Sequence, residues 1–388
     1  MGFSEQFDQA LASPSPLLRR MERLLTADSG NGAALESLAL QAHEISLRKF
    51  GRTMRLFAPV YLSNECINNC AYCGFSRDNP ILRLTLTPDQ VVKESRHLLD
   101  QGFRTLLLVA GEHPKFVTDG YLEECLRRLA ATVPSLGIEV GPMETPEYRR
   151  MVDAGAESLV VYQETYDRAA YAEYHTAGPK KDFDWRLDCP ERGHDGGFRR
   201  IGVGALFGLA DWRTEALGLA AHLEYLQKHC WKASFTVAFP RLRPAAGEFQ
   251  PRTVLSDRDL VQLICAFRIL FPEVGIISST REPAALRDQL VPLGVTHMSA
   301  GSRTEPGGYT NQGEDDLHLT VKGRRKELGK TAQEESDGAE EQFGIADKRS
   351  PEEVAKMLRQ QGYDPVWKDW DASILEVSPA PAILSDVS

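Results

Sequence analysis

Eight short apolar runs alternate with amphipathic stretches along the middle of this chain, and this alternation restricts the folds that the chain can adopt. The runs cover residues 56–62, 105–110, 137–141, 158–162, 201–205, 234–239, 275–279 and 295–299. Stretches with helical spacing lie between them, for example at 88–100, 121–132, 145–154 and 214–230. Strands that alternate with helices form parallel βα units. Eight such units predict a closed α/β barrel of the (β/α)8 type, whose functional side chains gather at the C-terminal ends of the strands.

The predicted barrel, residues 56–310, has additions on both sides. Residues 1–55 are rich in Leu, Ala, Glu and Arg at helical spacing, which predicts an N-terminal helical extension. Residues 311–348 are highly charged and poor in apolar side chains, so we expect a mobile surface segment, with a lid over the strand ends as the alternative. Residues 349–388 are expected to form a C-terminal helix, at 351–361, and a tail.

Composition excludes several classes of protein. The 388 residues carry a net charge of −10 with both signs interspersed, which argues against partners such as nucleic acids or anionic membranes. No apolar window approaches the roughly 18 residues of a membrane span. The cysteine count is 7, an odd number without disulfide-like spacing, and this favours a reducing cytoplasm.

Three of the cysteines are closely spaced. Cys66, Cys70 and Cys73 are separated by three and two residues, and Tyr72 precedes the last of them. A closed zinc or iron–sulfur site normally needs four protein ligands, and the other cysteines are scattered singly. Three thiolates on a 4Fe-4S cluster would leave one iron open for chemistry. The alternatives are a Cys₃His zinc site or three cysteines packed in a core.

Polar residues follow several of the predicted strands. Gln163 and Glu164 end the fourth run, where an amide and a carboxylate can bind two neighbouring hydroxyls, although a helix N-cap cluster is the alternative. Arginines accompany hydroxyl groups after the later runs, and a guanidinium beside hydroxyls suits an amino-acid carboxylate. The residues concerned are Arg241, Arg281, Arg303, Ser299 and Ser302. Salt bridges to Glu144, Glu282 or Asp288 are the competing interpretation for these arginines.

The CxxxCx(aromatic)C pattern resembles the signature of the radical S-adenosylmethionine (SAM) superfamily. In that superfamily the open iron binds the amino and carboxylate groups of SAM, and the reduced cluster cleaves SAM to methionine and a 5′-deoxyadenosyl radical. The resemblance implies that the metal ligands are Cys66, Cys70 and Cys73.

The resemblance also implies that Tyr72 approaches the adenine, that Glu112 binds the amino group, and that Gln163 and Glu164 contact the ribose or the methionine part. Arg186 lies where related enzymes keep an arginine for the SAM carboxylate, with a surface arginine as the alternative. The glycines at 202–208 would let the adenine lie close to the backbone, where Leu209 could line its face.

Further motifs narrow the resemblance. Leu107-Leu-Val-Ala-Gly-Glu-His113, Val161-Tyr-Gln-Glu-Thr-Tyr166, Phe239-Pro-Arg-Leu-Arg-Pro244 and Ser279-Thr-Arg-Glu282 are similar to motifs of the 2-iminoacetate synthase family, the tyrosine lyases of thiamine biosynthesis. This implies Cα–Cβ cleavage of L-tyrosine to 2-iminoacetate (dehydroglycine) and p-cresol, with 5′-deoxyadenosine and methionine formed from SAM. The implied partners are a flavodoxin or ferredoxin as electron donor and a thiazole synthase that receives the product.

The same resemblance suggests substrate-binding residues. We expect Arg281, helped by Ser299 or Ser302, to bind the tyrosine carboxylate. Glu144, Arg241 and Tyr309 are weaker candidates for the amine, the phenol or an exit for an electron and a proton.

Three alternative functions remain to be weighed. A tyrosine lyase that makes carbon monoxide and cyanide needs a second cluster on C-terminal cysteines, and Cys265 is the last cysteine here. A tryptophan lyase of the same superfamily stays open, because sequence does not define the size of the pocket. A non-enzymatic iron–sulfur or zinc protein would not need an eight-unit barrel with polar strand ends.

Overall fold

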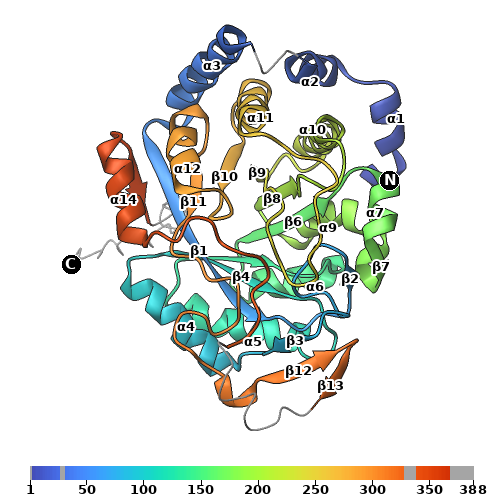
Figure 1. Cartoon of the computed structure of the whole chain (residues 1–388), viewed down its shortest axis with the longest axis vertical. Coiled ribbons are helices and arrows are strands. Elements are labelled where there is room, and N and C mark those ends of the chain that lie inside the picture. The colour runs from blue at the N-terminus through green and yellow to red at the C-terminus, as the bar shows by residue number, and fades with distance from the viewer. Residues whose placement is uncertain (1, 27–30, 327–337, 368–388) are drawn as a thin grey trace, which may run out of the picture.

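Eight parallel strands close into a barrel in the computed structural model, which describes residues 2–26, 31–326 and 338–367 (Figure 1). All eight predicted strands are confirmed: β1 (Thr53–Ser63), β4 (Thr105–Ala110), β5 (Ser135–Glu139), β6 (Ser158–Glu164), β8 (Arg200–Ala205), β9 (Ser234–Ala238), β10 (Gly275–Ser278) and β11 (His297–Ser299). Pairing of Leu56 in β1 with Met298 in β11 closes the ring. Every strand pair around it is parallel, so all C-terminal ends lie at one rim.

Helices surround the barrel (Figure 1). They are α4 (Pro88–Asp100), α5 (Asp119–Ala130), α6 (Thr145–Asp153), α7 (Arg168–Tyr174), α8 (Phe183–Leu187), α9 (Cys189–Gly196), α10 (Trp212–His229), α11 (Asp257–Leu270), α12 (Ala284–Leu290) and α14 (Pro351–Gln360). The local sequence determines where several of these helices begin. Thr87 forms a capping box with Gln90 at α4, and Ser350 does so with Glu353 at α14.

The N-terminal extension adds an outer layer of helices over α10 and α11. It consists of η1 (Phe3–Glu5), α1 (Phe7–Ala12), α2 (Pro16–Thr26) and α3 (Gly32–Phe50). The ring of Phe3 stacks on His222 and Tyr225 of α10, with centroids 5.1 and 4.7 Å apart. These contacts bury an aromatic surface that would otherwise face water.

The two faces of the barrel strands differ in the size of their side chains. Outward-facing Leu106, Leu108, Leu159 and Ile201 are almost fully buried beneath the helices. Several inward-facing positions are smaller or polar, and they include Thr105, Ser158, Gly202 and Thr236. Because these side chains do not fill the axis, the interior contains a cavity of about 530 Å³.

Residues 311–348 contain structure that the sequence did not predict. After η4 (Glu314–Asp316), strand β12 (His318–Val321) pairs with β13 (Arg324–Lys326) and with β3 (Ile81–Arg83). Residues 338–348 then cross the rim at the C-terminal ends of the strands, where Gln342 N donates to Thr304 O (2.9 Å) and Gly344 N to Pro244 O (2.8 Å). We call residues 338–348 the strap.

Shorter elements complete the fold. They are β2 (Asn69–Cys70), β7 (His175–Ala177), η2 (Pro179–Lys181), η3 (Val291–Leu293) and β14 (Asp364–Val366), the last of which pairs with the start of β1. Residues 327–337 of the charged segment and 368–388 of the predicted C-terminal tail lie outside the described residues.

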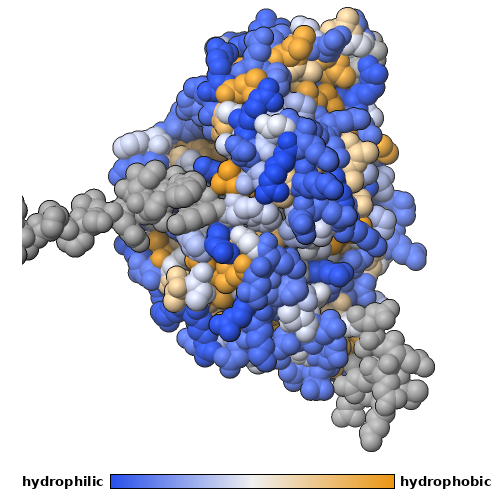
Figure 2. Space-filling view, turned by 90° about the vertical axis from the view of Figure 1, so that its left-hand side faces the viewer, coloured by the Kyte–Doolittle hydropathy of each residue, from blue (hydrophilic) through white to orange (hydrophobic). Residues whose placement is uncertain are grey.

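The surface is mostly hydrophilic, with hydrophobic side chains in small separate groups on the face that Figure 2 shows. Large exposed apolar residues such as Leu40, Trp231 and Val254 come from separate parts of the chain. Within the described ranges, no helix has the length and apolarity needed to cross a bilayer.

A buried ion pair anchors the strap to α12. The side chains of Arg287 and Asp347 pair at 0% and 1% exposure. Removing one partner leaves the other charge buried, so Asp347→Ala should lower the free energy of unfolding by about 3–5 kcal/mol. Urea denaturation would measure this. The control Glu173→Ala breaks an exposed pair with Arg252 and should cost less than about 1 kcal/mol; an equal effect of both variants would contradict the assignment.

Candidate active site

The cysteine loop begins where β1 ends and is hydrogen-bonded to the segment after β4 and to the end of α7. Its Ile67 N donates to Glu112 O (2.8 Å), and Ala71 N donates to Tyr174 O (3.0 Å). Strand β2, which contains Cys70, pairs with β7 near His175. The three cysteines, all free thiols, are thereby held at the C-terminal rim of the barrel.

Two polar side chains, one buried and one partly buried, hold the loop in shape. Arg83 donates to the carbonyl oxygens of Asn64 (2.5 Å), Phe75 (3.1 Å) and Ser76 (2.8 Å). The amide of Asn79 donates to Cys73 O (3.1 Å), Gly74 O (3.0 Å) and Ala246 O (3.1 Å). Because the backbone is satisfied by protein groups, the loop conformation is formed by the chain itself.

The thiols are close enough to influence one another electrostatically. Burial raises the pKa of Cys70, and the Lys180 ammonium lowers it in part, while Cys73 and Cys66 raise it further. Burial likewise raises the pKa of Cys73. Such thiols lose their protons when they bind a metal centre, so metal binding releases protons and depends on pH.

The three cysteines do not form a ready-made site for a single metal ion. Among the described residues, no three His, Cys, Asp or Glu side chains converge as one metal ion requires, so the zinc interpretation finds no four-ligand site there. A cubane instead spreads its thiolates over separate irons. Gly111 allows the end of β4 to approach the loop, because a Cβ at this position would lie 2.3 Å from Glu65 O.

A charged cluster lies beside the cysteines. Lys180 Nζ donates to Glu164 Oε1 (2.7 Å), and Arg186 Nη2 is 3.6 Å from the same oxygen. Burial raises the pKa of Glu164 but Lys180 and Arg186 outweigh it, so the carboxyl remains ionised. Glu164 has a φ of 72°, a strained conformation for a non-glycine residue that aims its carboxylate at the two cations.

Other predicted cofactor-binding residues surround the loop. Glu112 accepts from Asn68 Nδ2 (2.6 Å), and the Tyr72 hydroxyl contacts His175 Nε2 (2.8 Å). Leu209 is fully buried in an apolar cluster that includes Tyr72 and Cys70. These residues therefore lie around the cysteines and supply both charged and apolar groups that a bound cofactor could contact.

Gln163 lies on the other side of its strand. Tyr162 lines the cavity, whereas Gln163 is buried and its amide nitrogen donates to Phe183 O of α8 (3.2 Å). Alternation along β6 sends it outward, so the structure does not bring it to the cavity.

The predicted carboxylate-binding residues meet inside the upper part of the cavity. Arg281, Ser299 and Ser302 all line it. The guanidinium of Arg281 lies 3.2 Å from the centre of the Phe343 ring and makes no hydrogen bond with the described residues. Ser299 Oγ accepts from Thr280 N (3.2 Å), while Ser302 Oγ is buried without a hydrogen-bond partner in the described structure.

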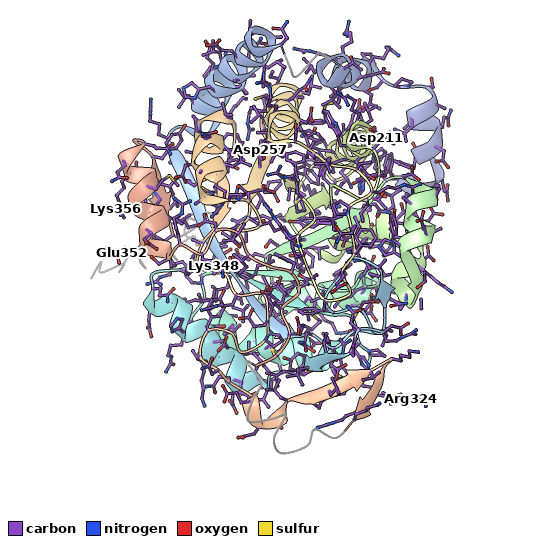
Figure 3. All side chains as sticks on the ribbon, viewed as in Figure 1. Asp211, Asp257, Arg324, Lys348, Glu352 and Lys356 are labelled. Atoms are coloured by element: carbon purple, nitrogen blue, oxygen red, sulfur yellow. The ribbon has the colours of Figure 1, made fainter. Side chains whose placement is uncertain are left out.

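The structure places Glu144, Arg241 and Tyr309 outside this cavity. Glu144 is exposed at the start of α6, and its N–H donates to Glu147 (2.8 Å). Arg241 pairs with Glu282 and with Asp257 (2.7 Å), which Figure 3 labels at the start of α11. The Tyr309 hydroxyl donates to Pro59 O (2.8 Å) and accepts from Arg303 N (3.1 Å). For Arg241, the salt-bridge interpretation is therefore confirmed.

Sequence reasoning missed two residues at the site. Glu139 lines the cavity from β5, and Lys180 binds Glu164. Glu139 could have been found from the sequence, because it is a carboxylate within an otherwise apolar predicted strand. Lys180 carried no comparable signal, because it belongs to the short helix η2, and only the tertiary fold places this helix beside Glu164.

Comparisons with known proteins agree with this geometry. The family model described as the radical SAM superfamily matches residues 60–215, and the one described as the biotin and thiamin synthesis associated domain matches residues 238–364. The chain is 42% identical to the 2-iminoacetate synthase of Escherichia coli (strain K12) over 339 residues, covering 87% of this chain and 84% of that relative. Identity and coverage are the same for the 2-iminoacetate synthase of Salmonella typhimurium.

A solved structure supports the fold. The FeFe-hydrogenase maturase HydG from Carboxydothermus hydrogenoformans superposes with a TM-score of 0.80 and 33% identity. The superposition covers 95% of this chain and 79% of that one.

The carboxyl of Glu139 generates a prediction about pH. Burial and the neighbouring Glu164 raise its pKa from 4.5 to about 7, although Arg281 opposes them. Between these pH values the folded protein holds a proton that the unfolded chain loses, so this group lowers stability as pH rises. Glu139→Gln should remove that contribution. Urea denaturation at pH 5 and 7.5 should show a stability gain over the unsubstituted chain that is larger at pH 7.5; a gain independent of pH would contradict it.

Proposed function

We propose a catalytic arrangement from the premise that this chain belongs to the 2-iminoacetate synthase family, within the radical SAM superfamily. It is accordingly a carbon–carbon lyase of thiamine biosynthesis that cleaves L-tyrosine to 2-iminoacetate and p-cresol. The observation that carries this conclusion is the 42% identity over 87% of the chain. The intact three-cysteine loop above a barrel cavity supports it.

Cys66, Cys70 and Cys73 would hold a 4Fe-4S cluster whose fourth iron is left for SAM. When bound, the cluster and SAM supply the radical that removes a hydrogen atom from the substrate. Around them we assign the adenine side to Tyr72 and Leu209, and the polar groups of SAM to Glu112, Glu164 and Arg186. Lys180 keeps Glu164 ionised and oriented, because it donates to that carboxylate at 2.7 Å.

The substrate would lie between two opposite charges in the upper cavity. Arg281 supplies a cation for the tyrosine carboxylate, and the unsatisfied hydroxyl of Ser302 adds a donor. Glu139 is suited to the amine, because a carboxyl with a pKa of about 7 can accept a proton from the ammonium group. This pairing would orient the amino nitrogen for hydrogen abstraction.

The strap would shield the reacting groups from water. Phe343 covers the guanidinium of Arg281, and Gln342 accepts a hydrogen bond from the Tyr61 hydroxyl (2.8 Å). Enclosure matters because the imine product hydrolyses readily. The partners we infer are a flavodoxin or ferredoxin as electron donor and a thiazole synthase as recipient, in a reducing cytoplasm that preserves thiol ligands.

The reaction is tested by an anaerobic product assay. With reconstituted protein, dithionite, SAM and tyrosine, we expect 5′-deoxyadenosine and p-cresol to form together, and Cys70→Ala to abolish both. Liquid chromatography of the products measures this. An indole product from tryptophan, without p-cresol from tyrosine, would assign the chain to the tryptophan lyases instead. Uptake of zinc without iron would reject the enzyme function.

Arg281 offers a test of the substrate site. Loss of a charge-assisted hydrogen bond costs about 1.5–3 kcal/mol, so Arg281→Ala should weaken tyrosine binding by roughly 10- to 100-fold while SAM binding persists. Equilibrium titration of each ligand measures both affinities. Arg303→Ala serves as the control, because that arginine is exposed and does not line the cavity. Equal loss of tyrosine and SAM binding in Arg281→Ala would move Arg281 to the cofactor site.

A further inference from the structure

The strap and the cysteine loop meet at Gly74. The N–H of Gly74 donates to Gln342 O (3.1 Å), and a Cβ on this glycine would lie 2.6 Å from Glu341 O and 2.7 Å from Gln342 O. A glycine is therefore needed here for the strap to lie this close to the loop. The residue before Gly74 is Cys73, one of the three cluster ligands assigned above. The contact thus brings a strap residue next to a metal ligand.

The strap residue concerned is Gln342, which is held at both its backbone and its side chain. Its N–H donates to Thr304 O (2.9 Å), and its carbonyl accepts from Gly74 N. In the side chain, Oε1 accepts from the Tyr61 hydroxyl (2.8 Å), and Nε2 donates to Cys73 Sγ (4.0 Å). Because Tyr61 engages the amide oxygen, the NH₂ group is the part of the amide that faces the sulfur.

Tyr61 is well fixed for this role. It lies on β1 at 5% exposure, and its ring packs edge-to-face on Phe75 with centroids 5.9 Å apart. A buried tyrosine hydroxyl needs a hydrogen-bond partner, which Gln342 provides. Burial raises the pKa of Tyr61 well above its ordinary value, so the hydroxyl keeps the proton that it donates.

The sulfur of Cys73 also has a backbone partner. Burial raises the pKa of the Cys73 thiol, whereas a hydrogen bond from the backbone of Phe75 lowers it. Within the described part of the chain, Cys73 is the one cysteine of the loop whose sulfur accepts from a side chain. An N–H group beside a thiolate stabilises its negative charge. Since an iron–sulfur cluster gains negative charge when it is reduced, hydrogen bonds to its sulfurs raise its reduction potential.

We propose that Gln342 tunes the cluster through Cys73: its amide donates to the Cys73 thiolate and thereby raises the reduction potential of the cluster. The inference rests on the proposed function, which supplies the cluster. On reduction the cluster accepts one electron from the donor protein or from dithionite, and no bond of the chain is broken.

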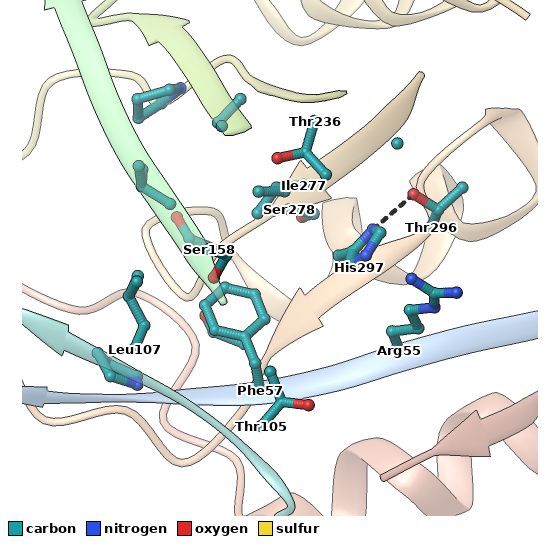
Figure 4. Close-up of a pocket in the computed structure, with 18 of the residues that line it drawn as sticks. Arg55, Phe57, Thr105, Leu107, Ser158, Thr236, Ile277, Ser278, Thr296 and His297 are labelled. Carbon is teal, nitrogen blue, oxygen red and sulfur yellow. Dashed lines mark hydrogen bonds between the residues drawn. The ribbon is translucent and has the colours of Figure 1, made fainter. Parts of the chain in front are cut away.

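The same segment also borders the substrate site. Gln342 and its neighbour Phe343 line the barrel cavity, another part of which, around Phe57 and Thr105, is shown in Figure 4. Phe343 covers Arg281 there, while Gln342 reaches Cys73. The strap thus encloses the substrate site and stabilises the reduced cluster at once.

The test is an anaerobic redox titration of the reconstituted full-length protein without SAM, followed by the EPR signal of the reduced cluster. Gln342→Met keeps the length of the side chain but removes the N–H donor. It should shift the equilibrium about 10-fold toward the oxidised cluster, which for a one-electron couple is a potential about 59 mV lower. Gln342→Glu should shift it further in the same direction, because a carboxylate replaces the donor with a negative acceptor.

Two further variants separate the amide from the seating of the strap. Thr304→Val removes a hydrogen bond from Thr304 Oγ1 to Phe343 O (3.0 Å) without touching Cys73, so the equilibrium should change less than 2-fold. Tyr61→Phe removes the hydroxyl that orients the amide, so it should shift the equilibrium in the same direction as Gln342→Met, but by less. An equal shift in Thr304→Val and Gln342→Met would overturn the role of the amide.

Iron and sulfide contents of each variant keep the outcomes distinct. Unchanged or raised potentials in Gln342→Met and Gln342→Glu, at the iron content of the unsubstituted protein, would overturn the inference and leave the proposed function intact. If one of these two variants fails to hold the cluster, the other and Tyr61→Phe decide in the same way. Failure of the unsubstituted protein to take up iron would reject the proposed function itself.

Discussion

Pairing of β1 with β11 is the constraint on which the remaining structure depends. It closes the barrel and brings the C-terminal ends of eight strands to one rim. The cysteine loop leaves β1 at this rim and is hydrogen-bonded to Glu112, after β4, and to Tyr174, at the end of α7. The loop has a defined shape because the side chains of buried Arg83 and partly buried Asn79 donate hydrogen bonds to its carbonyl groups.

Charge is distributed unevenly along the barrel axis. Near the cysteines, the Glu164 carboxylate is stabilised by Lys180 and Arg186. In the upper cavity, Glu139 and Arg281 face the same space with opposite charges. Weak solvent screening inside a cavity strengthens the interaction of such charges with a zwitterionic substrate.

The strap connects stability to function. The buried pair between Arg287 and Asp347 anchors it to α12, and its Phe343 ring packs against the guanidinium of Arg281. Its backbone bonds to Gly74, Thr280 and Pro244 join the cysteine loop to the later strand ends. Enclosure of the site is therefore a property of packed tertiary contacts, even though this part of the chain reads as a charged surface segment.

The sequence by itself determined the barrel, the cysteine loop and the presence of Arg281, Ser299 and Ser302 at strand ends, because periodicity and local spacing are written in consecutive residues. Only the tertiary structure decided which polar groups face inward. It turned Gln163 toward α8, engaged Arg241 with Glu282, and used Tyr309 for backbone hydrogen bonds. It also brought Glu139 and Lys180 to the site and left the axis hollow. The physical reason is that strand parity, ion pairing and interior volume depend on neighbours that are distant in the chain.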